Sequence, residues 1–173
     1  MTIRFDKILH LIEECKYSIH DISRAEVDVA TGLPRFNMPL ELGLDLGCKR
    51  YGKPHHQEKV LLVLDVERFR YRDFISDISG QDIEAHSGEP REVINAVRNW
   101  LRLELDPKSV ITPSGAVIYE RYSRFQATLP TICAKLSWDI GDLPFSDFSW
   151  AVADWIASNP LPKPAPPPRH RLT

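Results

Sequence analysis

The sequence lacks several features that assign a protein to a class quickly. It has three cysteines among 173 residues and no Cys-x-x-Cys pair, so a disulfide framework is not expected and a reducing, cytoplasmic location is predicted. No window approaches roughly 18 uninterrupted apolar residues. The N-terminus has no basic segment followed by an apolar run. We therefore expect no membrane span, signal peptide or membrane partner.

The charges have no dominant sign. The chain carries 22 Lys and Arg against 24 Asp and Glu, for a formal net charge of −2. Binding to nucleic acid relies on a clustered basic face, so no nucleic-acid partner is expected. In "RFRYRDF" (Arg68–Phe74) arginines alternate with aromatic residues, but the neighbouring acids favour an amphipathic helix face. A P-loop, a GxGxxG motif and a nucleophile elbow are all missing.

Patterns typical of helices and strands alternate along the first hundred residues. "KVLLVLD" (Lys59–Asp65) is a continuous apolar run, which is typical of a strand covered on both faces of a parallel sheet. Alternation of this kind predicts an α/β fold with a short parallel sheet flanked by helices. The expected helices are Phe5–Cys15, Met38–Arg50, Glu67–Ile78 and Glu89–Leu105, and the other expected strands are Tyr17–Ser23 and Asp82–His86.

The rest of the chain has a different character. We expect an α/β domain over residues 1–105, a helical extension over 106–158 that is broken near Pro130, and a disordered proline-rich tail over 159–173. Helical spacing places five apolar residues on one side of the last helix, with the middle three buried: Phe145, Phe148, Val152, Trp155 and Ile156.

Two acids fall where an open parallel sheet binds ligands, outside the carboxyl ends of its strands. Asp21 closes the first strand, and Glu41 is expected in the first turn of the next helix, where the macrodipole favours an ionised carboxylate. Such a group acts as a nucleophile or stabilises an oxocarbenium ion in glycosidic cleavage. The alternative is structural: Asp21 caps a loop, and Glu41 is a solvated acid. An adjacent pair, His55 and His56, lacks the further ligands that a metal site needs, so no metal is expected.

Four motifs follow one another around these acids. They are Asp21-Ile22-Ser23 at a strand end, Asn-x-x-x-Glu-Leu-Gly from Asn37 to Gly43, Gly52-Lys53-Pro54 in a turn, and an apolar strand from Val60 to Leu64. In this order they resemble the TIR-like and nucleoside 2-deoxyribosyltransferase-like superfamily, which has flavodoxin-type folds. The resemblance covers roughly Ile8 to Trp100.

The resemblance implies a nucleotide-binding protein that acts as an N-glycosidase on NAD or a related nucleotide, in bacterial defence or signalling. It implies that Glu41 and Asp21 are the catalytic pair, with Glu41 acting at C1′ of a ribosyl group and Asp21 contacting the ribose or base. Ser23, Arg35 and Asn37 would line the pocket. The nucleotide is the substrate, and no separate cofactor is expected. The alternative is a non-catalytic interaction module that keeps the fold.

Members of this superfamily begin with a strand, a substrate-contacting loop and a helix that have no counterpart before Phe5. The strand Tyr17–Ile22 would then be an open edge. We expect it to be completed in trans, most simply in a symmetric homodimer, unless the native chain begins upstream of Met1.

Overall fold

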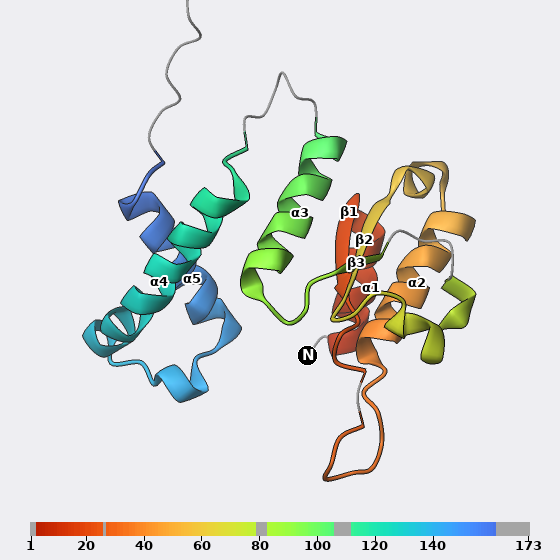
Figure 1. Ribbon diagram of the computed structural model, residues 1–173, viewed down its shortest axis with the longest axis horizontal. Coiled ribbons are helices and arrows are strands. Elements are labelled where there is room, and N and C mark those ends of the chain that lie inside the picture. The colour runs from red at the N-terminus through yellow and green to blue at the C-terminus, as the bar shows by residue number, and fades with distance from the viewer. Residues whose placement is uncertain (1–2, 26, 79–82, 106–111, 162–173) are drawn as a thin grey trace, which may run out of the picture. The chain divides into compact units, whose positions relative to one another are not determined.

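The computed structural model describes residues 3–25, 27–78, 83–105 and 112–161 (Figure 1). The chain divides into two compact units, Met1–Tyr119 and Glu120–Thr173. We call these the α/β unit and the helical unit and describe each by itself.

The α/β unit is built on a three-stranded sheet. Its strands are β1 (Tyr17–Asp21), β2 (Val60–Asp65) and β3 (Ile83–Ala85), in the order β1-β2-β3. Both pairings are parallel, with Tyr17 opposite Val60 and Val63 opposite Ile83. The structure thus confirms the expected α/β fold with a short parallel sheet.

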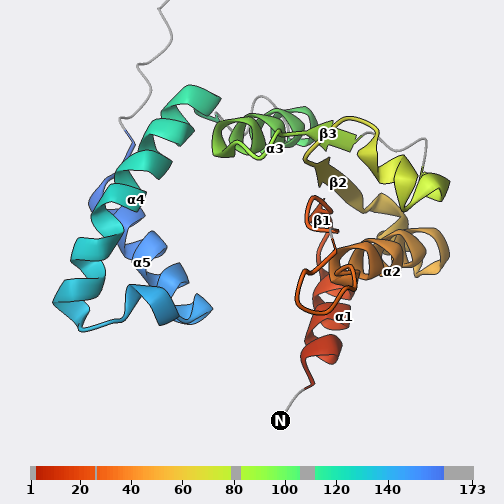
Figure 2. The same ribbon diagram turned by 60° about the horizontal axis from the view of Figure 1, so that its bottom comes forward.

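Three helices cover this sheet. Helix α2 (Asn37–Tyr51) follows β1 and lies on one side, whereas α3 (Pro90–Glu104) follows β3 and lies on the other (Figure 2). Helix α1 (Arg4–Glu14) packs beside α2 near β1. The observed α2 extends the predicted helix by one residue at each end. A 3₁₀ turn, η1 (Pro54–Glu58), connects α2 to β2.

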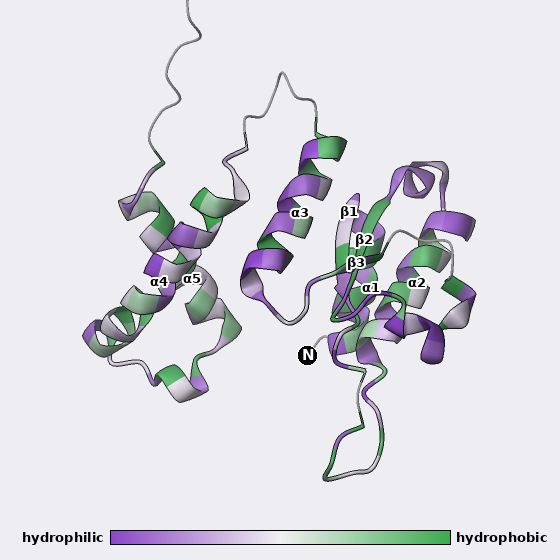
Figure 3. Ribbon diagram, in the orientation of Figure 1, coloured by the Kyte–Doolittle hydropathy of each residue, from purple (hydrophilic) through white to green (hydrophobic). Residues whose placement is uncertain are grey.

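The core of the α/β unit lies between α2 and the sheet. Ile22, Leu42, Val63 and Tyr71 form its buried centre. On the opposite face of β2, Leu62 and Leu64 are also buried, so the strand is covered on both sides. Figure 3 shows the hydrophobic character of β2 that made it recognisable in the sequence.

The helix predicted over Glu67–Ile78 is wrong. Two short 3₁₀ turns, η2 (Arg70–Asp73) and η3 (Ser76–Ile78), replace it. Phe69 adopts a left-handed backbone with φ of 66°, which an α-helix cannot include. The Arg70 guanidinium turns inward and binds the Asp65 carboxylate, so the alternating arginines do not share one solvated face.

β1 is an edge strand. Among the described residues its one strand neighbour is β2, and the side chain of Ile19 is 44% exposed. α1 contains no buried residue although its sequence is amphipathic. Both observations match the open edge expected from the sequence. The homodimer stays a prediction, which light scattering would test.

The helical unit has its own core. It comprises most of α4 (Gly115–Leu136), which begins in the preceding unit, the 3₁₀ turn η4 (Ile140–Asp142) and α5 (Phe145–Ser158). The buried residues at its centre are Phe125, Leu129, Cys133, Ala151 and Trp155. The Phe125 ring meets the ring of Trp155 edge-on at a centroid distance of 5.8 Å.

The expectations for the helical unit are confirmed in part. Trp155 is buried, and Phe148 and Val152 are partly buried against it. The prediction is wrong at both ends of the expected apolar face, because Phe145 is 83% exposed and Ile156 is 52% exposed. The expected break at Pro130 is also wrong, since α4 continues through it. Pro130 is exposed, so water can reach the helix where the proline has no N–H to donate.

The structure tests two further expectations only in part. Most of the predicted disordered tail, residues 162–173, lies outside the described residues. Across the described ranges, no helix combines the length and apolar composition needed to cross a bilayer.

Candidate functional site

The position of Glu41 follows from how α2 lies against β1. α2 runs back antiparallel to the strands, because it joins two parallel ones. The position of α2 along β1 is set by the contact between Asp45 Oδ2 and His20 Nε2, which lie 2.9 Å apart. Glu41 lies one helical turn, about 5.4 Å, closer to the start of α2. That displacement carries it to the level where β1 ends, so Glu41 lies at the carboxyl edge of the sheet, as the sequence predicts.

The expected first-turn position of Glu41 is wrong. α2 begins at Asn37, so Glu41 is its fifth residue, and the first turn contains no acid. The helix dipole acts mainly on groups within that turn, and Glu41 lies just beyond it. Asn37 is the first helical residue, and Phe36 is the N-cap.

Glu41 lies half-buried where α2 faces α1. It lines two adjoining hollows of about 180 and 310 Å³, which we call the α1–α2 groove. Ile8 of α1 borders both, and Asn37 borders the second. In the part of the chain that the structure describes, Glu41 makes no hydrogen bond or ion pair. Apolar side chains of α1 line the groove beside it, and the basic side chain of Arg4 borders the second hollow.

Asp21 is held in place by neighbours from two other segments. Its Oδ1 accepts a hydrogen bond from the Ser23 backbone N–H at 3.0 Å and lies 3.4 Å from His86 Nε2. His86 Nδ1 accepts the Gly88 N–H at 3.0 Å, so the ring hydrogen resides on Nε2 and points at Asp21. Partial burial raises the pKa of Asp21, but the hydrogen bonds from Ser23 and the contact with His86 outweigh it and lower that pKa.

A second strand-end acid organises the same edge. Asp65 ends β2 and is fully buried. Its Oδ1 accepts hydrogen bonds from Arg70 Nε at 2.9 Å and Nη2 at 2.6 Å. The same Nη2 also donates to the carbonyl groups of Ile22 at 3.2 Å and Ser23 at 2.7 Å. Arg70 therefore ties the segment after β1 to the end of β2 and fixes the backbone on which Asp21 depends.

The five residues predicted from the sequence fall into three places. Asp21 and Ser23 lie together with His86, on the face of the sheet covered by α3. Asn37 and Glu41 share the α1–α2 groove on the other face. Arg35 lies in an exposed loop and pairs with Asp28 at 3.1 Å. Asp21 and Glu41 thus occupy the same edge of the sheet but lie on opposite faces of it.

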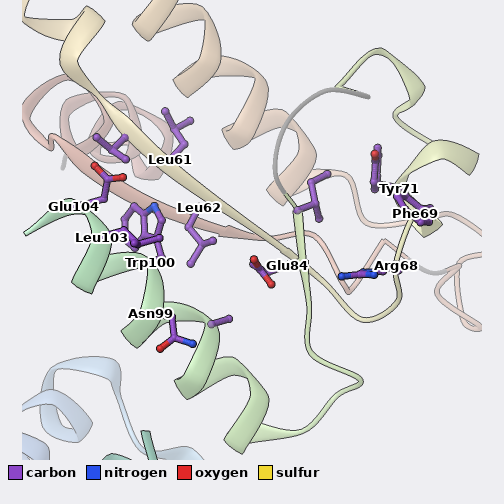
Figure 4. A pocket seen from close by; sticks show the side chains of 13 residues that line it. Leu61, Leu62, Arg68, Phe69, Tyr71, Glu84, Asn99, Trp100, Leu103 and Glu104 are labelled. Carbon is purple, nitrogen blue, oxygen red and sulfur yellow. The ribbon is translucent and has the colours of Figure 1, made fainter. Parts of the chain in front are cut away.

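A separate hollow of about 550 Å³ lies between α3 and the sheet (Figure 4). Trp100 and Leu62 form apolar parts of its wall, and Asn99 and Glu84 add polar atoms. None of the five site residues predicted from the sequence lines this hollow.

A buried ionic cluster beneath α1 was missed in the sequence. Lys59 Nζ lies 3.1 Å from Asp45 Oδ1, and both side chains are almost completely buried. The same ammonium donates to the carbonyl groups of Ile12, at 2.6 Å, and Cys15. Burial raises the pKa of Asp45, but hydrogen bonds from His20, Ser18 and Lys59 outweigh it and lower that pKa. We call Lys59, Asp45 and His20 the inner cluster.

The paired histidines have a structural role. His56 is buried, and its Nδ1 accepts the Lys53 backbone N–H at 3.0 Å. Burial lowers the pKa of His56, which keeps the ring neutral at the turn before β2. Across the described residues, no group of three or more His, Cys, Asp or Glu side chains is arranged to hold a metal ion.

Comparison of the chain with known protein families, with characterised proteins and with solved structures finds no match.

Proposed function

We propose that the α/β unit binds a nucleotide across the carboxyl edge of its sheet and cleaves an N-glycosidic bond with Glu41 as the reacting carboxylate. The observation that carries the proposal is the state of Glu41. Of the two acids that follow Asn37 in α2, Asp45 pairs with Lys59 and His20, whereas Glu41 has no hydrogen-bond or ion-pair partner among the described residues and borders the α1–α2 groove. The resemblance of the Asn37–Gly43 segment to the superfamily motif supports the same role.

The chemistry needs one carboxylate in this position. When the bond between C1′ and the base nitrogen breaks, the base leaves with the bonding electrons, and C1′ becomes an oxocarbenium ion. An ionised Glu41 stabilises that positive charge. Water then adds to C1′ and gives up one proton. With NAD as substrate, the products are nicotinamide, ADP-ribose and a proton.

The test is release of nicotinamide from NAD by the full chain, followed by liquid chromatography, with other nucleotides run in parallel. We expect Glu41→Gln to lower the rate by at least about 100-fold, the scale of losing one transition-state electrostatic contact. Glu92→Gln is the matched control, because Glu92 is an exposed acid in the first turn of α3. It should leave the rate unchanged.

Two results would contradict the proposal. Equal rates for the two variants would remove Glu41 from the reaction. A folded wild-type chain that cleaves no nucleotide of the panel would leave the alternative, a non-catalytic interaction module that keeps the fold.

A further inference from the structure

We propose that two copies of this chain join through their β1 strands, which pair antiparallel about a two-fold axis at Ile19 and form one continuous sheet. β1 lies at the end of the sheet away from β3 (Figure 2). An edge strand offers unpaired backbone groups to any strand of matching length, so the features of the edge itself have to identify the occupant. The inference does not depend on the proposed function.

The first feature is the direction of the backbone groups of β1. The Val60 N–H donates to the Lys16 carbonyl group at 2.9 Å. Because alternate residues of a strand turn their N–H and C=O groups to opposite sides, the even-numbered residues of β1 bond to β2. The groups of Tyr17, Ile19 and Asp21 face the open edge, and among the described residues no backbone hydrogen bond reaches them.

These three outward-facing residues are symmetric about Ile19. When a second β1 is reversed about Ile19, Tyr17 lies opposite Asp21 of the other copy, and Ile19 lies opposite its own counterpart. Each is then a hydrogen-bonded pair of an antiparallel ladder, in which the two residues exchange both backbone hydrogen bonds. A shift by two residues leaves outward groups without a partner. The register about Ile19 is therefore the one that satisfies every outward group of both copies.

The side chains along the edge fit this register. Tyr17 meets the ring of Trp100 of α3 edge-on at a centroid distance of 6.0 Å, and alternation along the strand places Ile19 on the same face. Both Tyr17 and Ile19 remain partly exposed. Directly opposite residues of an antiparallel pair lie in contact, so the two Ile19 side chains would cover each other at the axis.

Charges at the two ends of β1 favour a second copy over an unrelated strand. Glu14 precedes β1 and Arg24 follows it, at the same sequence distance from Ile19. Both side chains are exposed, and neither has an ion-pair partner among the described residues. Reversal about Ile19 brings Glu14 of each copy towards Arg24 of the other. A two-fold arrangement of this kind closes on itself, so one surface serves both copies.

The experiment is light scattering on the full chain, which should give twice the 19.8 kDa mass of one chain. Ile19→Lys places like charges directly opposite each other and should raise the dimer dissociation constant at least about tenfold. Leu103→Lys is the matched control, because Leu103 is an exposed apolar residue of α3. It should leave the dimer unchanged.

A charge exchange tests the register. Arg24→Glu and Glu14→Arg should each raise the dissociation constant about fivefold, and the two together should restore it. Within one chain the two positions lie at opposite ends of β1, so the restoration requires contact between copies. A combined variant as weak as either single one would overturn this register.

Hydrogen exchange identifies the paired strand directly. The amides of Tyr17, Ile19 and Asp21 should exchange slowly in the wild type and rapidly in Ile19→Lys, whereas those of Ser18 and His20, which bond to β2, should stay slow in both. A monomeric wild type would overturn the proposal, because the edge would then be open or covered by its own chain. A dimer in which the three outward amides exchange rapidly would overturn it as well, since the copies would meet elsewhere.

Discussion

Two clusters of charged side chains in the α/β unit use similar residues for different ends. In the inner cluster, Lys59, Asp45 and His20 are each at most 5% exposed, and one carboxylate oxygen of Asp45 lies beside the ammonium while the other lies beside the ring. The second cluster, which we call the edge cluster, comprises Asp21, His86, Asp65 and Arg70, and in it the Asp21 side chain is 44% exposed. An acid paired on both oxygens in a dry interior holds a helix in register. An acid that stays partly exposed at a sheet edge is available to a ligand.

The largest expected effect comes from breaking the inner cluster. Asp45→Ala leaves the Lys59 ammonium buried without its counter-charge, and removing one partner of a buried pair costs about 3–5 kcal/mol of unfolding free energy. Urea denaturation followed by circular dichroism measures it.

The double variant Asp45→Leu with Lys59→Met is the control for that prediction. Replacing both charges by apolar side chains removes the uncompensated ion, so it should recover most of the loss. A double variant as unstable as Asp45→Ala alone would mean that packing, and not charge, accounts for the effect.

A smaller loss is expected in the edge cluster. Arg70→Met removes the donors to Asp65 and to the carbonyl groups of Ile22 and Ser23. Because Arg70 is partly exposed, water can replace some of these bonds, and we expect a cost of about 2 kcal/mol in the same urea measurement. A cost equal to that of Asp45→Ala would show that the edge is as dry as the interior.

The smallest expected effect is on the pH dependence of stability. The folded pKa of Asp45 is lowered, so the unfolded chain binds the proton more readily. The stability that this difference supplies is complete above the unfolded value of about 3.9 and is lost as the pH falls through the folded value. Thermal unfolding between neutral pH and pH 3 should therefore show a shallower acid decline for Asp45→Asn than for the wild type. Parallel declines would contradict the ionic role of Asp45.

The sequence predicted the backbone of the α/β unit better than its chemistry. A continuous apolar run such as Lys59–Asp65 carries its own signal, because burial on both faces demands it. Asp65 could have been found by the rule that found Asp21, since both close a strand. The segment around Arg70 has near-helical spacing, but its inward ion pair and the left-handed Phe69 depend on the position of β2, which local sequence does not contain.

The inner cluster illustrates what local pattern cannot supply. His20 lies in β1, Asp45 in α2 and Lys59 just before β2. The three side chains meet because of where α2 packs along β1. Asp45 lies among leucines and glycines, and this local sequence is equally compatible with a buried acid and a solvated one. The position of Glu41 at the sheet edge was predictable from element order, whereas its freedom from a partner was not.

From the strand order we expect the sheet to assemble around β2 when the chain folds. β1 has nothing to pair with until β2 is present, because Tyr17 lies opposite Val60, and β3 waits for β2 as well. Each pairing closes a long loop before any contact rewards it, and such non-local steps are slow. β2 is therefore the template on which the sheet assembles, and its apolar surface stays open to aggregation for as long as either neighbour is missing.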